Sequence, residues 1–487
     1  PAARAARRRE AAMLLEEQGE FGAAGKLLEE ALAENPKDEA VLSSVVTAYE
    51  RSRRKTELEA VLTNTLTNLD PVVDEPRARQ RRASFWEKLG DLRRRKDKDG
   101  AIQALETAVS IDGERVEARA TLAKLYGNKE EFAAAALENH RRLVQVDLSR
   151  TDSLRTLARS HAARGEIDRA RCYLELLDLF GEAKREDRAF LANHALPVRR
   201  PEDPYASGLN ETDLVERLAH PEARVLAPLF AAIWEGVPGL GGATLESLGL
   251  TPLDKVSPIA DMVLAQIFGQ VVKALENRRA SLYVASALAS TGQMTTLLVP
   301  PPPSIVVAPA LVEAEPAVMR FLIGRAVELC RPEYILGMAL PSAEFTQMLS
   351  SLLKAFHPRH ARWRAGDGSA ASEQAAKLKK ALPYKVSKRL AELFQENEAQ
   401  SFSSVRWRQV VDETGNRAGL LMCGELATAA RVILGESYPG TEPNAETYLE
   451  LASQPGPLRE LLRFSISDAC FSLRETLGTS VPRAAAA

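Results

Sequence analysis

Histidine and cysteine are the side chains that most often bind metals or act as nucleophiles, and both are rare in this chain of 487 residues. His357 and His360 are the one close pair among six histidines, and Pro358 with flanking arginines favours an exposed turn there over a metal site. The four cysteines form no CxxC motif, which excludes a zinc ribbon and predicts reduced, buried thiols: Cys172, Cys330, Cys423 and Cys470. No GxSxG motif occurs either. The residues alone therefore indicate no catalytic side chain, no metal and no cofactor.

The composition is that of a folded protein with more than one domain. Lys plus Arg total 64 and Asp plus Glu total 66, and this balance argues against a dedicated nucleic-acid-binding protein. Alanine, leucine, arginine and glutamate recur throughout, which favours helices. The chain contains no uninterrupted apolar run of about 18 residues and no signal-peptide pattern, so we expect no membrane insertion and a cytoplasmic location.

A repeated pattern runs through the first third of the chain. Equivalent positions are 34 residues apart from Pro36 to Asp70, which is the spacing of a helix-turn-helix unit. A small residue such as Ala24 lets the two helices of a unit approach closely, while Gly19 and Gly165 suit the left-handed backbone at the end of a first helix. One such pair cannot bury its apolar face alone, so the pattern predicts pairs that stack into a solenoid.

This pattern resembles the tetratricopeptide repeat (TPR). The resemblance covers residues 10–181, roughly five repeats, and includes Trp86-x-x-Leu89-Gly90. It departs at Asn139 and Arg142, where the repeat has larger apolar and small residues. A generic amphipathic helical bundle is the alternative. The resemblance implies that the first helix of each pair lines a concave groove that binds peptides or protein helices.

Several cations are predicted to face this groove by their position in the repeat. They are Arg94, Lys124, Arg155 and Arg159. These residues favour an acidic protein or peptide partner, and the alternative is that they are solvated cations without a binding role. His161 occupies a core position of the last repeat, so we expect it to be packed.

A second architecture follows the repeats. Prolines within a charged stretch predict a linker over 182–209, followed by an α-rich domain over 210–480. Long helices are expected at 259–277 and 315–340. Short strands are expected at Ser281–Ala287, Thr295–Val299 and Ser304–Ala308.

Two segments of this second region carry a further resemblance. The run from Ala317 to Leu336 and the run from Val411 to Leu421 resemble the active-site helix and the third-ligand helix of M48-type zincin peptidases. In that family a glycine precedes His-Glu-x-x-His, and the later helix supplies a glutamate followed four residues on by an aspartate. The corresponding positions here are Arg325, Ala326, Leu329, Asp412 and Asn416.

The chemical groups of the zincin motif are therefore missing. One carboxylate cannot hold a catalytic zinc ion, which needs three protein ligands. Arg325 places a cation where the metal would lie, and we expect it to pair with Asp412 or Glu413. A plain helical domain without zincin ancestry is the alternative.

The sequence thus predicts a mostly α protein, with a TPR α-solenoid followed by an α-rich α+β domain that resembles an inactive zincin. We expect a non-catalytic protein-interaction scaffold, a pseudoenzyme that binds a protein or peptide within a larger multi-protein assembly, as large bacterial TPR proteins do. It is expected to use no cofactor, metal or nucleic acid. The alternatives are a metal-dependent peptidase or hydrolase, and a pseudoenzyme that binds peptides in the former substrate cleft.

Overall fold

The computed structural model describes residues 2–69, 75–127, 130–236, 242–257, 259–361 and 370–482. The chain divides into two compact units, Pro1–Leu157 and Ala158–Ala487. Helices dominate both units, and the described strands form a single small sheet, which confirms the mostly α fold class. Within the described residues, no helix combines the length and the apolar character that crossing a membrane requires.

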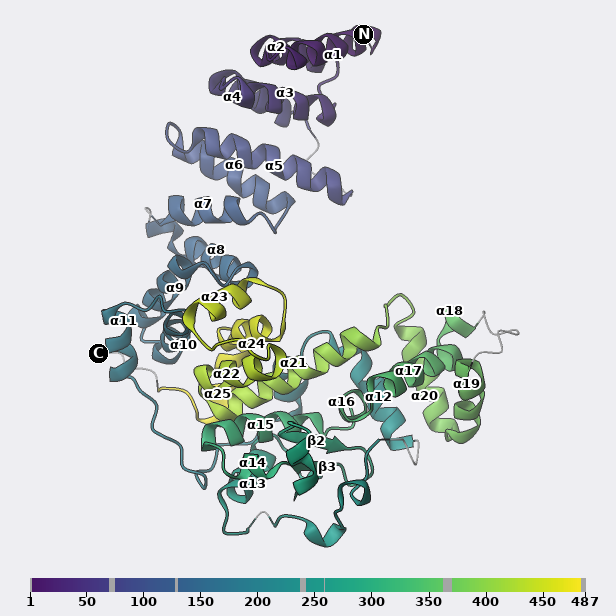
Figure 1. Cartoon of the computed structure of the whole chain (residues 1–487). Helices are drawn as coiled ribbons and strands as arrows, with labels where there is room; N and C mark the ends of the chain where they lie inside the picture. Colours follow the sequence, from purple (N-terminus) through teal and green to yellow (C-terminus); the bar gives the residue numbers. More distant parts are fainter. Residues whose placement is uncertain are drawn as a thin grey trace. The chain divides into compact units, whose positions relative to one another are not determined.

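The first unit consists of successive helices, each packed against the next along the chain (Figure 1). Their bounds are α1 Ala2–Glu17, α2 Phe21–Glu34, α3 Glu39–Arg51, α4 Lys55–Leu66, α5 Pro76–Arg93, α6 Lys98–Ile111, α7 Val116–Tyr126 and α8 Ala133–Val146. The helix α9, Thr151–Ala163, begins in this unit and ends in the second. Because contacts join sequence neighbours, the unit is a linear stack of helix pairs, as the repeat pattern predicts.

Small residues allow the helices of this stack to approach closely. Ala24 is fully buried, and a Cβ atom added to Gly25 of α2 would lie 2.5 Å from the ring of Tyr49 on α3. Gly19 has a φ of +80° in the turn between α1 and α2, where only glycine adopts the backbone without strain. The side chain of Asp38 accepts hydrogen bonds from the first turn of α3 and fixes where that helix begins.

The second unit is larger and its helices pack over long sequence separations. Its early elements are α10 Ile167–Leu179, α11 Arg185–Asn193, a π-helical turn Asp213–Leu218, α12 Ala223–Gly236 and α13 Val263–Ala274. The middle elements are α14 Pro309–Val312, α15 Pro316–Leu329, α16 Ile335–Ala339, α17 Ser342–Phe356, α18 Pro358–Ala361, α19 Ala370–Ala381 and α20 Tyr384–Glu396. The last are α21 Ser404–Cys423, α22 Leu426–Ser437, α23 Ala445–Ser453, α24 Pro457–Ser465 and α25 Asp468–Leu477.

The sheet has three short strands in the order β1-β3-β2. They are β1 Ser281–Val284, β2 Thr295–Leu298 and β3 Ser304–Val307, which confirms the three strands expected from the sequence. β1 pairs with β3 in parallel and β2 pairs with β3 antiparallel. All four residues of β3 are buried, as a central strand with covered faces requires.

Two stretches differ from the sequence expectation in instructive ways. The long helix expected over 315–340 ends at Leu329 and a separate helix begins at Ile335, because Pro332 disfavours the helical conformation of the residue before it. The stretch 182–209, expected as a linker, begins with α11 and then packs on the unit. Leu209 is fully buried and its amide donates to the carbonyl of Ala274 at 2.8 Å.

The helix α10, which the sequence places in the last repeat, is tied to the end of the chain. Asp168 of α10 accepts two hydrogen bonds from the guanidinium of Arg474 on α25, at 2.9 and 2.7 Å. It also accepts one from the amide of Val481 at 3.0 Å. Asp168 and Arg474 are both buried, so this bidentate pair is a strong contact that fixes α10 to α25.

Candidate functional site

The two segments that resemble zincin helices, α15 and α21, cross at close range in the second unit. Glycines make this possible on both helices. A Cβ atom added to Gly419 would lie 2.8 Å from the carbonyl oxygen of Phe321, and one added to Gly324 would lie 2.8 Å from the Cβ of Met422. Since neither position has room for a side chain, the glycines bring the backbones together and set which residues face each other at the crossing.

An ion-pair network spans the crossing of the two helices. Nη2 of Arg325 lies 3.0 Å from Oδ1 of Asp412, so the pair expected from the sequence is present. Nη1 of Arg325 pairs with Glu436 of α22, and Nδ2 of Asn416 donates to Oδ2 of Asp412 at 3.0 Å. Burial on its own lowers the pKa of Arg325, but Asp412 and Glu436 outweigh this effect and hold the pKa above its usual value. The guanidinium therefore remains charged and joins α15, α21 and α22.

The other positions of the zincin comparison are apolar. Ala326 and Leu329 are each 3% exposed and belong to the core. Among the described residues, no group of three or more His, Cys, Asp or Glu side chains is placed to hold a metal ion. The arrangement of α15 and α21 thus offers one carboxylate, one amide and one guanidinium, which can hold each other but supply no coordination sphere.

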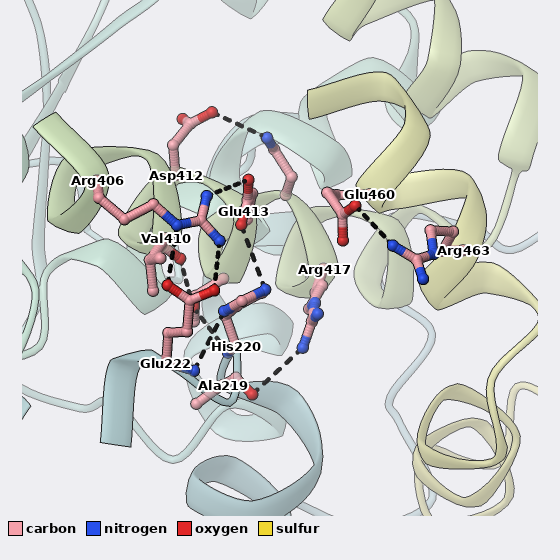
Figure 2. Close-up of polar contacts among 12 residues, drawn as sticks. Ala219, His220, Glu222, Arg406, Val410, Asp412, Glu413, Arg417, Glu460 and Arg463 are labelled. Carbon is pink, nitrogen blue, oxygen red and sulfur yellow. Dashed lines mark hydrogen bonds and ion pairs between the residues drawn. The ribbon is translucent and has the colours of Figure 1, made fainter. Parts of the chain in front are cut away.

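A second polar cluster lies on a neighbouring face of α21 (Figure 2). Arg406 donates to both carboxylate oxygens of Glu222, at 2.9 and 2.7 Å, and to Glu413 at 3.4 Å. Nε2 of His220 lies 3.4 Å from Oε2 of Glu413. The backbone amide of Glu222 donates to Nδ1 of His220 at 3.3 Å, so the proton of the neutral imidazole is on Nε2 and faces Glu413.

Burial shifts the protonation of both members of this cluster. Desolvation, with Arg406 opposing it and Glu460 adding to it, raises the pKa of Glu413 to about 6. Desolvation and the nearby Arg417 lower the pKa of His220 to about 4. At neutral pH the pair therefore consists of an ionised carboxylate and a neutral imidazole.

Backbone contacts hold this cluster in place. The amide of His220 donates to the hydroxyl of Thr414 at 3.0 Å, and Nη1 of Arg417 donates to the carbonyl of Ala219 at 3.2 Å. The guanidinium of Arg417 also lies over the ring of Phe464, 5.0 Å from its centroid. Two hydrogen bonds, to Thr414 and from Arg417, therefore hold the segment that carries His220 against α21. Sequence reasoning singled out Glu413 only as an alternative partner of Arg325 and did not find His220, because 194 residues separate His220 from Thr414.

The cations predicted for the groove have different environments. Arg94 at the end of α5 and Lys124 on α7 are exposed, both in the first unit. Arg155 is buried, with Nη1 3.6 Å from Asp152. Arg159, in the second unit, is exposed and pairs with Glu186 at 3.1 Å. Arg94 and Lys124 thus present their charge to solvent, whereas Arg155 does not.

The histidine and cysteine expectations have mixed outcomes. His161 is 1% exposed, contacts Glu166 at 2.6 Å and stacks on Tyr173, which confirms that it is packed. All four cysteines are buried and free, as expected. The exposed turn expected at His357 is wrong: its ring is buried and packs edge-on against Phe394 and Phe402. The side chain of His360 lies outside the described residues.

Part of the chain is similar to solved structures. MamA is 17% identical, with 41% of this chain and 100% of that chain covered and a TM-score of 0.29. YrrB, a TPR protein with an unusual peptide-binding site, is 15% identical, with 38% and 89% covered and a TM-score of 0.27. Comparisons with protein-family models and with curated proteins find no match.

Proposed function

We propose that the chain is a non-catalytic protein-interaction scaffold whose second unit keeps a peptidase-like framework without its chemistry. The observation that carries this proposal is the occupation of the zincin positions. Arg325 pairs with Asp412 at 3.0 Å, and Ala326 and Leu329 belong to the core. The guanidinium of Arg325 neutralises part of the charge of Asp412 and Glu436 and links α15 to α21 and α22 through charge-assisted hydrogen bonds, with no need for a metal ion at this place.

The first unit supplies the binding surface in this proposal. Its stacked helix pairs bury small and apolar residues between neighbours and leave polar faces outward. An extended surface of this kind suits a peptide or a partner helix, since each pair contributes a few side chains to a long contact. The exposed charges of Arg94 and Lys124 favour an acidic segment, because opposite charges speed the encounter and fix the register.

The absence of catalysis is tested on the intact protein. The purified chain is expected to hold no stoichiometric transition metal by elemental mass spectrometry. It is also expected to show no chelator-sensitive cleavage of a mixed peptide library. A tightly held metal, or turnover that persists through further purification and disappears with chelator, would contradict the proposal.

The binding surface is tested with a displayed library of random peptides selected on the full-length chain. Enriched peptides are expected to be acidic, and R94E/K124E is expected to weaken them at least tenfold. The control variant K26E/R142E removes exposed cations from the second helices of two pairs, and it is expected to bind like the wild type. Peptides that bind both variants equally would show that Arg94 and Lys124 play no part in recognition.

A further inference from the structure

A basic surface lies on the successive helices α19 and α20, which both pack against α17. Residues 374–391 contain six cations and no aspartate or glutamate. Lys377 and Lys380 on α19 and Lys385 on α20 are exposed, and Tyr384 between them is 81% exposed. We call these four residues the basic face. An exposed tyrosine among lysines is typical of contact surfaces, since its ring offers apolar area and its hydroxyl a hydrogen bond.

In the part of the chain that the structure describes, no ion pair involves Lys377, Lys380 or Lys385. This differs from α15 and α21, where most charged groups are paired. The two helices are anchored, because Leu382 and Leu390 are buried and Gly236 of α12 packs under Val386 of α20. The basic face is therefore held in a fixed orientation while its charges remain uncompensated.

An acidic surface lies around α23. Residues 432–458 contain four glutamates and no lysine or arginine. Glu436 is used by Arg325, and the other three are exposed: Glu442, Glu446 and Glu450. We call these three residues the acidic face. No ion pair involves them among the described residues, and Glu446 and Glu450, one helical turn apart, repel each other.

The two faces cannot neutralise each other within one molecule. Both belong to the second unit, and Figure 1 shows α19 and α20 at one side of it and α23 at the other. Each face carries three charges without an ion pair, of opposite sign; Lys377, Lys380, Lys385, Glu446 and Glu450 lie on helices, and Glu442 lies in the segment that precedes α23. Such surfaces attract each other between molecules, and the attraction weakens as salt shortens the Debye length from about 30 Å at 0.01 M to about 8 Å at 0.15 M.

We propose that the basic face of one chain binds the acidic face of a second copy of the same chain. The two surfaces differ, so the contact is heterologous: each chain that binds through one face leaves its other face available for a further copy. The association is expected to be weak and salt-dependent, since exposed ion pairs contribute little individually. This inference does not rest on the proposed peptide-binding groove and survives if that proposal fails.

The test uses the full-length chain and sedimentation velocity at 20 mM and 500 mM salt. The wild type is expected to associate at low salt and to dissociate at high salt. K377E/K380E/K385E and E442K/E446K/E450K are each expected to remain monomeric. A 1:1 mixture of the two variants is expected to associate, because the first retains the native acidic face and the second retains the native basic face.

Two further variants make the test specific. The chain that carries all six substitutions is expected to associate again, since the charges are exchanged rather than lost. K26E/K37E/K55E changes the net charge as much as the basic-face variant, but at exposed lysines of the first unit, and is expected to associate like the wild type. Circular dichroism verifies that each variant is folded.

Three outcomes would overturn the inference. The first is a wild type that stays monomeric at 20 mM salt up to about 100 µM, because salt screens the two faces least under that condition. The second is association that persists unchanged in both triple variants. The third is a mixture of folded triple variants that remains monomeric, which would show that the two faces do not recognise each other.

Discussion

Helices pack closely in both units of this chain, but the residues in contact are near in sequence in the first unit and far apart in sequence in the second. In the first unit, Gly25 of α2 faces Tyr49 of the next helix. In the second, Gly419 of α21 faces Phe321 of α15, about a hundred positions earlier in the sequence. Both units contain largely buried ion pairs, such as Arg82 with Glu39 in the first, but the contacts of the first unit join neighbouring repeats, whereas those of the second join residues that no repeat relates. We therefore expect single substitutions to cost more in the second unit.

The largest effect is expected at the buried pair between α10 and α25. Asp168→Ala leaves the guanidinium of Arg474 buried without its carboxylate and should cost about 3–5 kcal/mol of unfolding free energy. Urea denaturation of the full-length chain measures this. The double variant D168L/R474M removes both charges and is expected to recover most of the loss. A single variant as stable as the wild type would show that the pair does not hold the unit together.

The next effect is a pH dependence at Glu413. Its pKa in the folded protein is about 6, above the usual 4.5, so the folded state holds this proton more tightly than the unfolded state. The stability that the proton provides is present below pH 4.5 and is lost as the pH rises through 6. Glu413→Gln stays neutral at every pH and does not lose this stability. The free energy of unfolding of E413Q minus that of the wild type should therefore rise by about 2 kcal/mol between pH 4.5 and pH 8.

Denaturation of both proteins across this pH range gives the difference directly. The lowered pKa of His220 acts in the opposite direction, because its contribution is lost as the pH falls from 6.5 through 4. It acts in both proteins, however, and largely cancels in the comparison. A difference between wild type and E413Q that does not vary with pH would contradict the burial of an ionised carboxylate at this position.

A smaller effect is expected at the glycine crossing. Gly419→Ala places a methyl group 2.8 Å from a backbone oxygen, which cannot move aside cheaply, and should cost about 1–2 kcal/mol. Gly435→Ala on α22 is the matched control, because nothing lies within 4 Å of its added Cβ. The control should gain up to about 1 kcal/mol from helix propensity alone. Calorimetry of the two variants distinguishes close packing from backbone preference, and equal shifts would refute the crowding at Gly419.

The smallest effect is expected at an exposed ion pair. Arg159 and Glu186 lie 3.1 Å apart with side chains 64% and 65% exposed, so water screens their attraction. Glu186→Gln should change the free energy of unfolding by less than about 0.5 kcal/mol. If Glu186→Gln lowered the free energy of unfolding as much as Asp168→Ala, burial would not determine how much an ion pair stabilises this unit.

The sequence predicts the features that depend on neighbouring residues. Gly19 predicts a turn and Ala24 predicts a close contact between two helices of one repeat. A short apolar run predicts the strand at 304–307. The pairing of Arg325 with Asp412 is predicted from the resemblance of their two segments to zincin helices, and the structure contains the pair. No such relation links His220 to Glu413, or Asp168 to Arg474, so these contacts depend on the tertiary fold. The burial of Arg155 likewise depends on packing that its repeat position does not reveal.

The buried pair between Asp168 of α10 and Arg474 of α25 determines where the chain can be truncated. Residue 181, where the repeat pattern stops, looks like a natural place to divide the chain. A C-terminal fragment that starts there would lack Asp168 while still carrying Arg474 in its interior. We therefore expect a fragment that starts before α9 to be recovered in soluble form, and one that starts after α10 to be recovered as aggregate.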